Sequence, residues 1–387
     1  MRFVWEVVGK DDFEETQGGL NRYVQGYLHG LEQIGIDPRL HLAGQSNNAL
    51  VETQAQGGVL NRMRVMMASG FNARRRVANC DALVVNTHFA LYGTPFLLGA
   101  SLGRLRSPKS NRPVVIVHFH GPWSDESKVA EHAVNRISIF AKRSLEIYGL
   151  RAADRVVVLS QVFHDLLVDE YHIPSSKISI QRPGIERSWF GIDRAPSPRE
   201  QGQSKIIKLI AVRRLTPRMG FLELFNLLES IDFTVDGNPV HLAVVGDGAD
   251  RTRLTDWIKT HSRERWITLR GRLSDVELRG LMQNSMISIV PTTALEGFGL
   301  VVLESMAAGL PVITTGQGGL SEAMGPWNTP EYLFDLRDSD SLSSAIRHGL
   351  RASANREEID SLRAYASGFE WKTVATRIRN LVTETNG

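Results

Sequence analysis

Apolar and mixed stretches alternate along this chain and divide it into predicted strands and helices. Between many of the strands, apolar residues recur every three or four positions, as in 20–35, 135–148 and 220–231, which predicts amphipathic helices. Continuous apolar strands that alternate with helices predict parallel sheets covered on both faces, and therefore an α/β fold. The predicted strands cover residues 1–9, 82–89, 113–121, 154–160, 177–186, 205–212, 241–250, 266–271, 286–290 and 311–315.

The stretch from 187 to 204, RSWFGIDRAPSPREQGQS, is the best linker in the sequence because it is polar and rich in Pro, Gly and Ser. At 387 residues the chain is longer than one hydrophobic core usually serves. We therefore predict two doubly wound domains, 1–190 and 191–368, with the boundary in this linker.

Composition narrows the class of protein. Hydrophobic residues make up 42% and charged residues 22%, as in an ordinary globular protein. The first residues resemble a strand and not a secretory signal, and no run of 18 apolar residues occurs. Since a single cysteine, Cys80, cannot form an intramolecular disulfide, we expect a cytoplasmic protein.

The net charge of +3 is too small to indicate nucleic acid as a partner. Residues 1–185 carry 21 basic and 17 acidic side chains, which leaves 24 and 25 for the remainder. The positive balance is densest at 74–76, after the Met-rich stretch 62–67. Two interpretations stay open: a weak peripheral contact between a basic helix of the N-terminal domain and the inner face of a membrane, or a solvated charged face.

Residues 286–315, MISIVPTTALEGFGLVVLESMAAGLPVITT, form the centre of the predicted chemistry. The order is strand, glycine-containing loop, apolar helix from about Gly299, and strand. Glu296 lies in the loop and Glu304 inside the helix, eight positions apart. A carboxylate is costly to bury on an apolar helix without a partner, so this arrangement suggests a ligand.

Three loops of the second half follow strands directly and should meet at one edge of its sheet: RRLTPRMG, VGDGAD and TTALEGFG. Arginines in the first loop suit phosphate oxygens, and helix N-terminal amides after the last loop favour an anion. Glu296 and Glu304 would repel phosphates, so we expect them to accept hydrogen bonds from hydroxyls. A ligand with both a diphosphate and many hydroxyls is a nucleotide sugar.

Two loops of the first half are further candidates. Gly18 and Gly19 lie between the first strand and helix, where amides can approach a phosphate, although a tight turn without a ligand is equally consistent. His88, His118 and His120 lie near the ends of two strands, and alternation places His118 and His120 on one side of theirs. We take His120 as the functional candidate.

The run E-G-F-G-L-V-V-L-E, with A-A-G-L-P-V-I downstream, resembles the E-x7-E signature of retaining GT-B glycosyltransferases of glycosyltransferase family 4. The resemblance extends over nearly the whole chain, through RPGIE, RRL, GDG, LRG and FEW. It implies two Rossmann-like domains that face across a cleft, the first for the acceptor and the second for the nucleotide sugar. It also implies a C-terminal helix, within 369–387, that crosses back to the first domain.

The resemblance implies that His120 and Glu296 lie at the transferred sugar as catalytic residues and that Glu304 binds the ribose hydroxyls. Aromatic and polar residues at strand ends, His88 and Trp123, are expected to border the acceptor. The implied donor-binding residues are Gly18, Gly19, Arg213, Arg214, Arg218, Arg270, Gly271, Gly297, Phe298, Gly299, Leu300, Val301 and Glu304.

The chain departs from the family pattern R-L-x-x-x-K-G, because Met219 stands where that pattern has lysine. A cation expected on the phosphates is therefore missing, and we hypothesise that Arg218, or Arg213, replaces it.

The resemblance implies retention of anomeric configuration with no bound metal and no cofactor beyond the co-substrate, a UDP- or GDP-sugar. In the expected front-face route the acceptor hydroxyl loses its proton to a donor phosphate oxygen, and Glu296 as nucleophile is the alternative. An Asp-x-Asp pattern at Asp338 and Asp340 would suggest a metal in other transferases. Here it precedes a predicted helix, so we expect Asp340 to cap that helix and Asp338 to be solvated.

The expected function is transfer of a sugar from a nucleotide-diphosphate sugar to a hydroxyl of a saccharide, lipid-linked or small-molecule acceptor. Two alternatives remain. One is another two-domain sugar-nucleotide enzyme, such as an epimerase or an inverting transferase. The other is a catalytically silent scaffold or binding subunit, which the substitution at Met219 keeps open.

Overall fold

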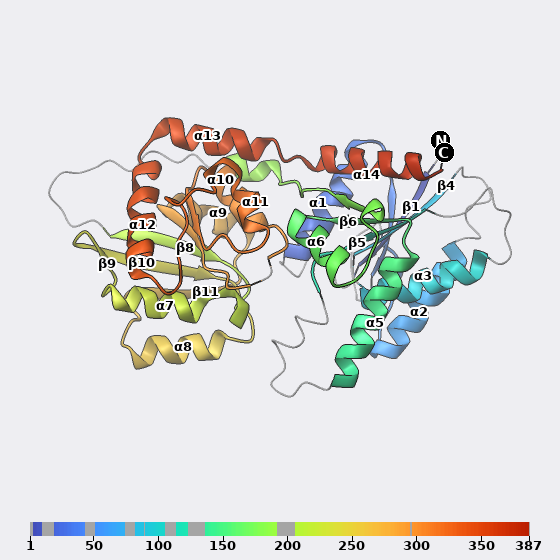
Figure 1. The fold of residues 1–387 in the computed structure, drawn as a ribbon, viewed down its shortest axis with the longest axis horizontal. Coiled ribbons are helices and arrows are strands. Elements are labelled where there is room, and N and C mark those ends of the chain that lie inside the picture. Colours follow the sequence, from blue (N-terminus) through green and yellow to red (C-terminus); the bar gives the residue numbers. More distant parts are fainter. Residues whose placement is uncertain are drawn as a thin grey trace. The chain divides into compact units, whose positions relative to one another are not determined.

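The computed structural model describes residues 3–9, 19–42, 51–73, 82–88, 90–104, 114–122, 136–191, 206–294 and 296–386. The chain forms two compact units (Figure 1). Unit 1 comprises residues 1–184 and 370–387, and unit 2 comprises 185–369. Both units are α/β, as the sequence pattern predicted. No helix in the described ranges combines the length and apolar character needed to span a membrane.

The described strands of unit 1 form one parallel sheet in the order β3-β2-β1-β4-β5-β6-β7. The chain moves outward from β1 to β3 and then restarts on the other side of β1 with β4. Ligands bind beyond the carboxyl ends of the strands at such a reversal. The bounds are β1 Phe3–Gly9, β2 Pro38–Leu42, β3 Val51–Gln54, β4 Ala82–Thr87, β5 Val114–His118, β6 Arg155–Val158 and β7 Ile178–Ile180.

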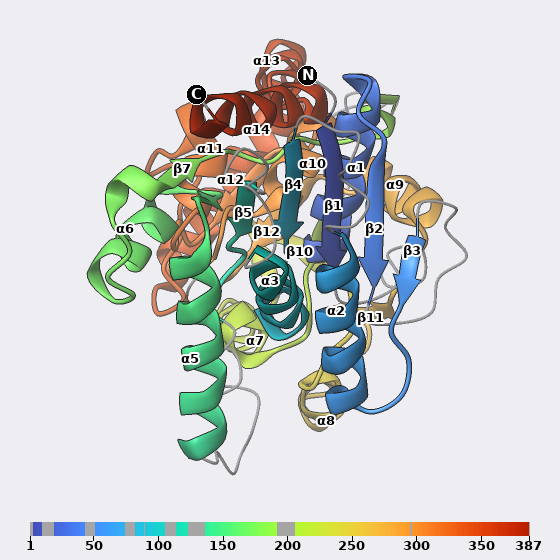
Figure 2. The same ribbon diagram turned by 90° about the vertical axis from the view of Figure 1, so that its right-hand side faces the viewer.

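Helices cover this sheet, and Figure 2 shows α3 between α2 and α5. Helices α2 and α3 approach closely through glycines. A Cβ atom at Gly70 would lie 2.1 Å from the carbonyl oxygen of Phe96, and one at Gly99 only 1.9 Å from that of Met67. The helices are α1 Gly19–Gln33, α2 Val59–Ala73, α3 Ala90–Arg104, α5 Arg136–Ala152, α6 Gln161–Asp169 and α14 Trp371–Asn386.

The last helix, α14, belongs to unit 1 and packs on α1, as expected for a C-terminal helix that returns to the first domain. Its first residue, Trp371, lies on a glycine face of α1. A Cβ atom at Gly26 would meet the Trp371 ring at 2.0 Å, and one at Gly30 would lie 2.4 Å from the Trp371 carbonyl oxygen. Only glycine allows this approach at the two positions.

A buried polar network connects the three strands on one side of the unit 1 sheet with α2. Glu6 and His41 are fully buried, and their Oε2 and Nε2 atoms are 2.5 Å apart. The His41 Nδ1 atom lies 3.1 Å from the Ser69 hydroxyl, which in turn lies 3.0 Å from the hydroxyl of Thr53. Because a buried polar group is costly without a hydrogen-bond partner, Glu6 and His41 depend on each other.

In unit 2 the described strands form a sheet in the order β11-β10-β8-β12-β13, and the short strand β9 pairs antiparallel with β10. The other pairs are parallel, so their carboxyl ends meet at one edge. The strands are β8 Ile207–Val212, β9 Thr234–Val235, β10 Asn238–Val245, β11 Ile267–Gly271, β12 Ile287–Val290 and β13 Val312–Thr314.

Some helices of unit 2 begin at side-chain caps, and one of these caps differs from the expected residue. Ser274 caps α9 in a capping box with Glu277. Asp338, not Asp340, caps α12, because its side chain accepts hydrogen bonds from the amides of Asp340 and Ser341. The helices are α7 Phe221–Ser230, α8 Arg251–Thr260, α9 Asp275–Gln283, α10 Leu300–Ala307, α11 Leu320–Met324, α12 Ser339–Ser353 and α13 Arg356–Ser367.

Candidate functional site

The strand ends of unit 2 carry the three loops that the sequence singled out. Arg213 follows β8, Gly246 follows β10, and Pro291 follows β12. The Gly246 amide donates to the Gly271 carbonyl at the end of β11, at 2.8 Å. A Cβ atom at Gly246 would lie 1.9 Å from the Arg213 carbonyl oxygen, so this glycine lets the β8 and β10 loops touch.

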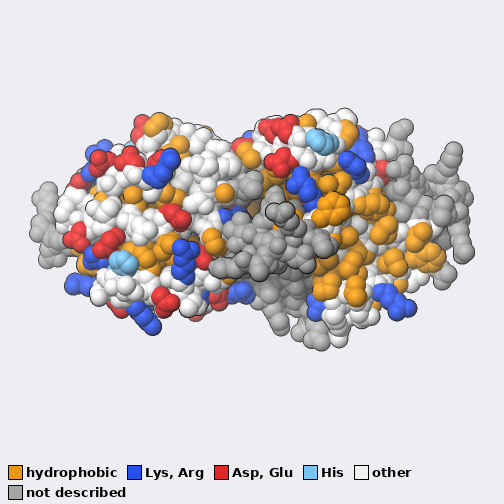
Figure 3. All heavy atoms as spheres, turned by 60° about the horizontal axis from the view of Figure 1, so that its bottom comes forward, with side chains coloured by type: hydrophobic (Ala, Val, Ile, Leu, Met, Phe, Trp, Pro, Cys, Tyr) orange, Lys and Arg blue, Asp and Glu red, His pale blue; other side chains and the backbone are white. Residues whose placement is uncertain are grey.

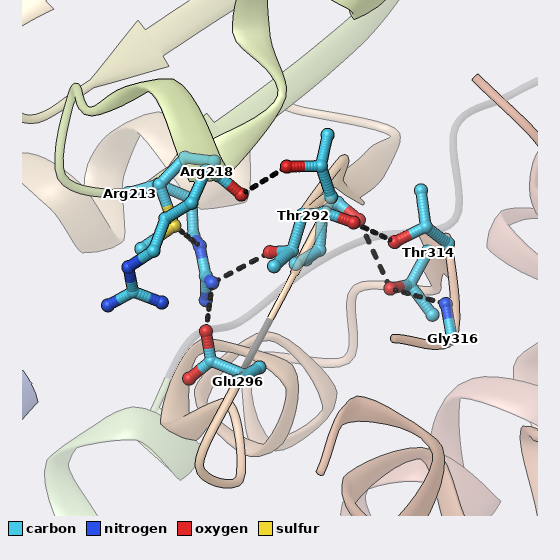
Figure 4. Close-up of polar contacts among 10 residues, drawn as sticks. Arg213, Arg218, Thr292, Glu296, Thr314 and Gly316 are labelled. Atoms are coloured by element: carbon cyan, nitrogen blue, oxygen red, sulfur yellow. Dashed lines mark hydrogen bonds and ion pairs between the residues drawn. The ribbon is translucent and has the colours of Figure 1, made fainter. Parts of the chain in front are cut away.

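Arg213 is the centre of a side-chain network at this edge (Figure 4). Its Nη2 atom donates to the Thr292 hydroxyl at 2.8 Å and also forms an ion pair with the Glu296 carboxylate. Its Nε atom donates to the Met219 sulfur at 3.3 Å. Only 7% of the Arg213 side chain and 16% of the Glu296 side chain are exposed, so the pair is largely shielded from water.

The other residues of the loop after β8 lie in different environments. Met219 is buried against the Arg213 guanidinium. In Figure 4 the Arg218 side chain lies beside that of Arg213, whose guanidinium is the one joined to Glu296, and the Arg218 backbone carbonyl accepts hydrogen bonds from Thr293. Arg214 is exposed at the strand end. Of the two arginines considered as replacements for the missing lysine, Arg213 is the one that contacts Met219.

The N-terminus of α10 lies directly after Glu296. The helix begins at Leu300, and Gly299 before it has a left-handed backbone with φ of +87°. A Cβ atom there would lie 2.5 Å from the Leu320 side chain. Glu304, one turn into the helix, is buried with 5% of its surface exposed. The predicted anion-favouring amides of 298–301 therefore lie at a real helix start.

The loop after β13, which the sequence did not single out, contacts the backbone of Glu296 and Thr292. The Gly319 amide donates to the Glu296 carbonyl at 2.8 Å, and a Cβ atom at Gly318 would lie 2.8 Å from the same oxygen. The Thr315 hydroxyl donates to the Thr292 carbonyl at 2.5 Å. The available signal was the run TTGQGG after a strand, whose three glycines permit close backbone approach.

The remaining donor candidates of unit 2 lie at the end of β11. Arg270 is exposed, and Gly271 has φ of +69° with the Arg251 guanidinium 3.4 Å from where its Cβ atom would be. Asp247 accepts a hydrogen bond from the Gly248 amide at 2.9 Å. Asp247 does not cap the following helix, because α8 begins after Asp250.

Three histidines meet at the strand ends of unit 1. The rings of His88 and His118 stack with centroids 4.1 Å apart, and the His88 Nδ1 atom lies 3.2 Å from the His120 Nε2 atom. His118 and His120 both pack against the ring of Tyr23, as the predicted alternation requires. The structure therefore brings the candidates His88 and His120 together.

Two tyrosines of α1 and one asparagine of β4 complete this cluster. The Tyr23 hydroxyl lies 3.2 Å from the His118 Nδ1 atom, and the His118 Nε2 atom lies 3.2 Å from the Asn86 amide oxygen. Tyr27 donates to the same oxygen at 3.2 Å. Our sequence reasoning assigned the tyrosines to the apolar stripe of the helix, although their spacing of four placed both hydroxyls on one face.

Burial keeps these histidines neutral near pH 7. It lowers the pKa of His120 to about 3, and it lowers the pKa of His88 and of His118 well below the usual 6.5. The neighbouring imidazoles lower the pKa of His88 and His118 further, because a second positive charge would be repelled. The His120 imidazole can therefore donate or accept a hydrogen bond without carrying charge.

Lowering the pH from 7.5 to 5.5 should destabilise unit 1. Below about pH 6.5 the histidines bind protons in the unfolded chain but stay neutral in the folded one. The free energy of unfolding therefore falls as the pH falls. One pH unit below 6.5, the loss approaches about 1.4 kcal/mol for each histidine and about 4 kcal/mol for three. Thermal unfolding between pH 5 and 8 measures the effect.

The variant His118→Gln removes one of these groups and should make the midpoint less sensitive to pH. Equal pH sensitivity of the variant and the parent protein would contradict the assignment of the effect to this cluster.

Some candidates lie outside the described residues, namely Gly18, Trp123 and the basic residues 74–76. Gly19 is the first residue of α1 and is exposed. Within the described ranges, no three His, Cys, Asp or Glu side chains are grouped so as to hold a metal ion.

Family models match both halves of the chain. Residues 17–189 match "Glycosyltransferase Family 4", and residues 194–366 match "Glycosyl transferases group 1". Glycogen synthase of Mycobacterium tuberculosis is 28% identical over 235 residues, which are 60% of this chain and 55% of that protein. The chain thus spans only about half the length of this relative.

Another relative aligns over nearly its full length. A phosphatidyl-myo-inositol mannosyltransferase of Propionibacterium freudenreichii is 24% identical over 95% of this chain and 91% of its own. Two solved structures share the fold: sucrose-phosphate synthase from Thermosynechococcus elongatus, with a TM-score of 0.74, 19% identity and 99% of both chains covered, and Anabaena HepE in complex with UDP-glucose. The HepE match has a TM-score of 0.68 and 18% identity over 98% of this chain and 99% of that one.

Proposed function

Since the chain belongs to the glycosyltransferases, with a family 4 first half and a group 1 second half, we propose that it transfers a sugar from a nucleotide-diphosphate sugar to an acceptor hydroxyl with retention of configuration. The observation that carries the proposal is the ion pair of Arg213 and Glu296 beside the N-terminus of α10. One edge of the sheet thus offers positive charge for a diphosphate and a carboxylate for sugar hydroxyls.

Positive charge at this edge has two sources. The amides at the N-terminus of α10 favour an anion, and the guanidinium of Arg213 suits forked hydrogen bonds to phosphate oxygens. Together they would stabilise the leaving diphosphate as the bond to the sugar breaks, without requiring a metal. Exposed Arg214 and Arg270 could add contacts to the phosphates and base.

The two glutamates would serve as hydrogen-bond acceptors. Glu296 lies before α10 and would bind hydroxyls of the donor sugar, whereas buried Glu304 would bind the ribose. In a front-face route the acceptor proton passes to a donor phosphate oxygen, so no protein base is needed. Neutral His120 of unit 1 would then orient a hydroxyl by hydrogen bonding, not by proton transfer.

The co-substrate that we propose is a UDP- or GDP-sugar. HepE, whose fold resembles this chain, was crystallised with UDP-glucose. The acceptor would be a saccharide, a lipid-linked sugar or a small glycoside bound near His88. An alternative is a catalytically silent subunit, which the buried Met219 in the lysine position favours; slow hydrolysis of the donor to free nucleotide would distinguish an enzyme from such a subunit.

Adding nucleotide diphosphates to the full chain should raise its thermal midpoint. A ligand present at about 100 times its Kd stabilises the folded state by about 2.7 kcal/mol. Thermal shifts measured with UDP, GDP, ADP and dTDP and with their sugars would identify the base. A flat response to every compound would overturn the donor assignment.

Glu296→Gln tests the role of this carboxylate separately. If Glu296 only binds hydroxyls, the variant should keep a modest fraction of the transfer rate, because an amide still offers an acceptor oxygen. Complete loss of transfer with unchanged donor binding would instead support a covalent role for Glu296.

A further inference from the structure

We propose that helices α2, α3 and α5 of unit 1 form a docking face for the surface of an anionic lipid bilayer. The proposal concerns a surface and not the donor chemistry, so it stands or falls independently of the proposed function. Three observations support it: the exposed apolar side chains of these helices, the adjacency of the helices, and their excess of basic residues.

Each of the three helices exposes a stripe of large apolar side chains. Of the ten most exposed such residues in the described chain, seven lie on these helices. Leu60 is 83% exposed and Phe140 is 74% exposed, which is unusual for side chains of this size. On α3 and α5 they recur at spacings of four and eight, which places them on one side of each helix. The seven are Val59, Leu60 and Met67 on α2, Leu98 and Leu102 on α3, and Phe140 and Tyr148 on α5.

These stripes belong to neighbouring helices. Helix α3 contacts α2 on one side and α5 on the other. Figure 3 shows hydrophobic side chains gathered over this part of unit 1, with Lys and Arg side chains at the edges of the patch. The apolar area is therefore shared by three adjacent helices and is not a set of scattered single residues.

Charge identifies the partner. The three helices carry seven Lys and Arg residues and a single acidic residue, Glu146, which is buried with 4% exposed. On α2, exposed Arg64 lies between Leu60 and Met67 at helical spacing. On α5, the Arg143 Nη2 atom lies 3.9 Å from the Glu170 carboxylate at the end of α6. The basic residues are Arg62, Arg64, Arg104, Arg136, Lys142, Arg143 and Arg151.

An anionic bilayer matches both properties of this face. Aliphatic and aromatic side chains insert at the boundary between headgroups and acyl chains, while Lys and Arg bind the anionic headgroups. A second copy of the chain is a poorer occupant, because a twofold contact would place the same cations against one another. Phe140 and Tyr148 are large aromatic residues, and Tyr148 also has a polar hydroxyl, so both suit the boundary between headgroups and acyl chains.

Vesicle flotation of the full chain tests the proposal. Binding to vesicles of phosphatidylcholine with about one third phosphatidylglycerol should exceed binding to pure phosphatidylcholine at least about tenfold, and it should fall as salt rises. The double variant Leu60→Gln/Phe140→Gln should reduce the bound fraction at least about fivefold. The matched control is Val276→Gln on α9 of unit 2, which is 71% exposed and should bind as the parent protein does.

Several results would overturn the proposal. They are no binding to anionic vesicles, equal binding to both vesicle types, or equal loss in the Val276→Gln control. A dimer in sedimentation that the double variant abolishes would assign the face to a second copy of the chain instead. Unchanged thermal midpoints and nucleotide-induced shifts in the variants show that folding and the donor site are intact, so failure here is distinguishable from failure of the proposed function.

Discussion

Replacing Arg213 with alanine should lower kcat/KM for the donor by about 100- to 1,000-fold, the loss typical for a group that stabilises charge in the transition state. The Arg213 guanidinium is held by the Thr292 hydroxyl, the Glu296 carboxylate and the Met219 sulfur. It contacts the residue that stands in the lysine position, so it can supply the cation that this position lacks.

A rescue variant makes this prediction specific. Adding Met219→Lys to Arg213→Ala should restore a large part of the lost activity, because a lysine would return the charge to the position where the family pattern has it. Met219→Lys alone should not help, since it would bring a second cation against Arg213. Initial rates over a range of donor concentrations measure all three variants.

Arg218→Ala decides between the two arginines. A smaller rise in the donor KM than Arg213→Ala causes is expected, because the ion pair with Glu296 and the guanidinium contact with Met219 both belong to Arg213. A larger effect at Arg218, combined with no rescue by Met219→Lys, would reject Arg213 as the replacement cation.

Replacing Glu6 with leucine should destabilise unit 1 by about 1–3 kcal/mol, the usual cost of leaving a buried polar group without its hydrogen-bond partner. The variant leaves the fully buried His41 without its hydrogen-bond partner in β1. Urea unfolding at pH 7.5 measures the loss, which should appear in the transition of unit 1.

The double variant Glu6→Leu/His41→Leu should recover much of this stability, because two apolar side chains remove the unpaired polar group. Glu384→Leu, at an exposed position of α14, is the matched control and should change stability little. Additive losses in the double variant would show that Glu6 and His41 do not depend on each other.

The fold class could be predicted from sequence because long apolar strands and amphipathic helices have distinct periods. Strands β2 and β3 were not identified. Strand β2 carries Arg39 and His41 among its five residues, and β3 is a short strand with alternating exposure, so neither shows a continuous apolar run. Strand β2 takes its place in the sheet by pairing with β1, and β3 takes its place by pairing with β2, and the apolar pattern of a single segment does not reveal such contacts between strands.

The donor side of the candidate site was easier to predict than the histidine cluster. Glu296 and the start of α10 are adjacent in sequence, so a local motif marks them. The choice between Arg213 and Arg218 required side-chain directions that the sequence does not contain. Likewise, Tyr23 and His118 are 95 positions apart, and only the folded sheet brings the hydroxyl to the imidazole.

The packing of Trp371 on the glycines of α1 has a consequence for biosynthesis. Unit 1 is discontinuous in sequence, because residues 185–369 of unit 2 are synthesised before α14, so its surface at Gly26 and Gly30 stays uncovered until α14 has been made. Unit 2, which is continuous in sequence, can complete its core first. We therefore expect unit 2 to complete its core while unit 1 still waits for α14, so the nascent form of unit 1 exposes the face of α1 that Trp371 later covers.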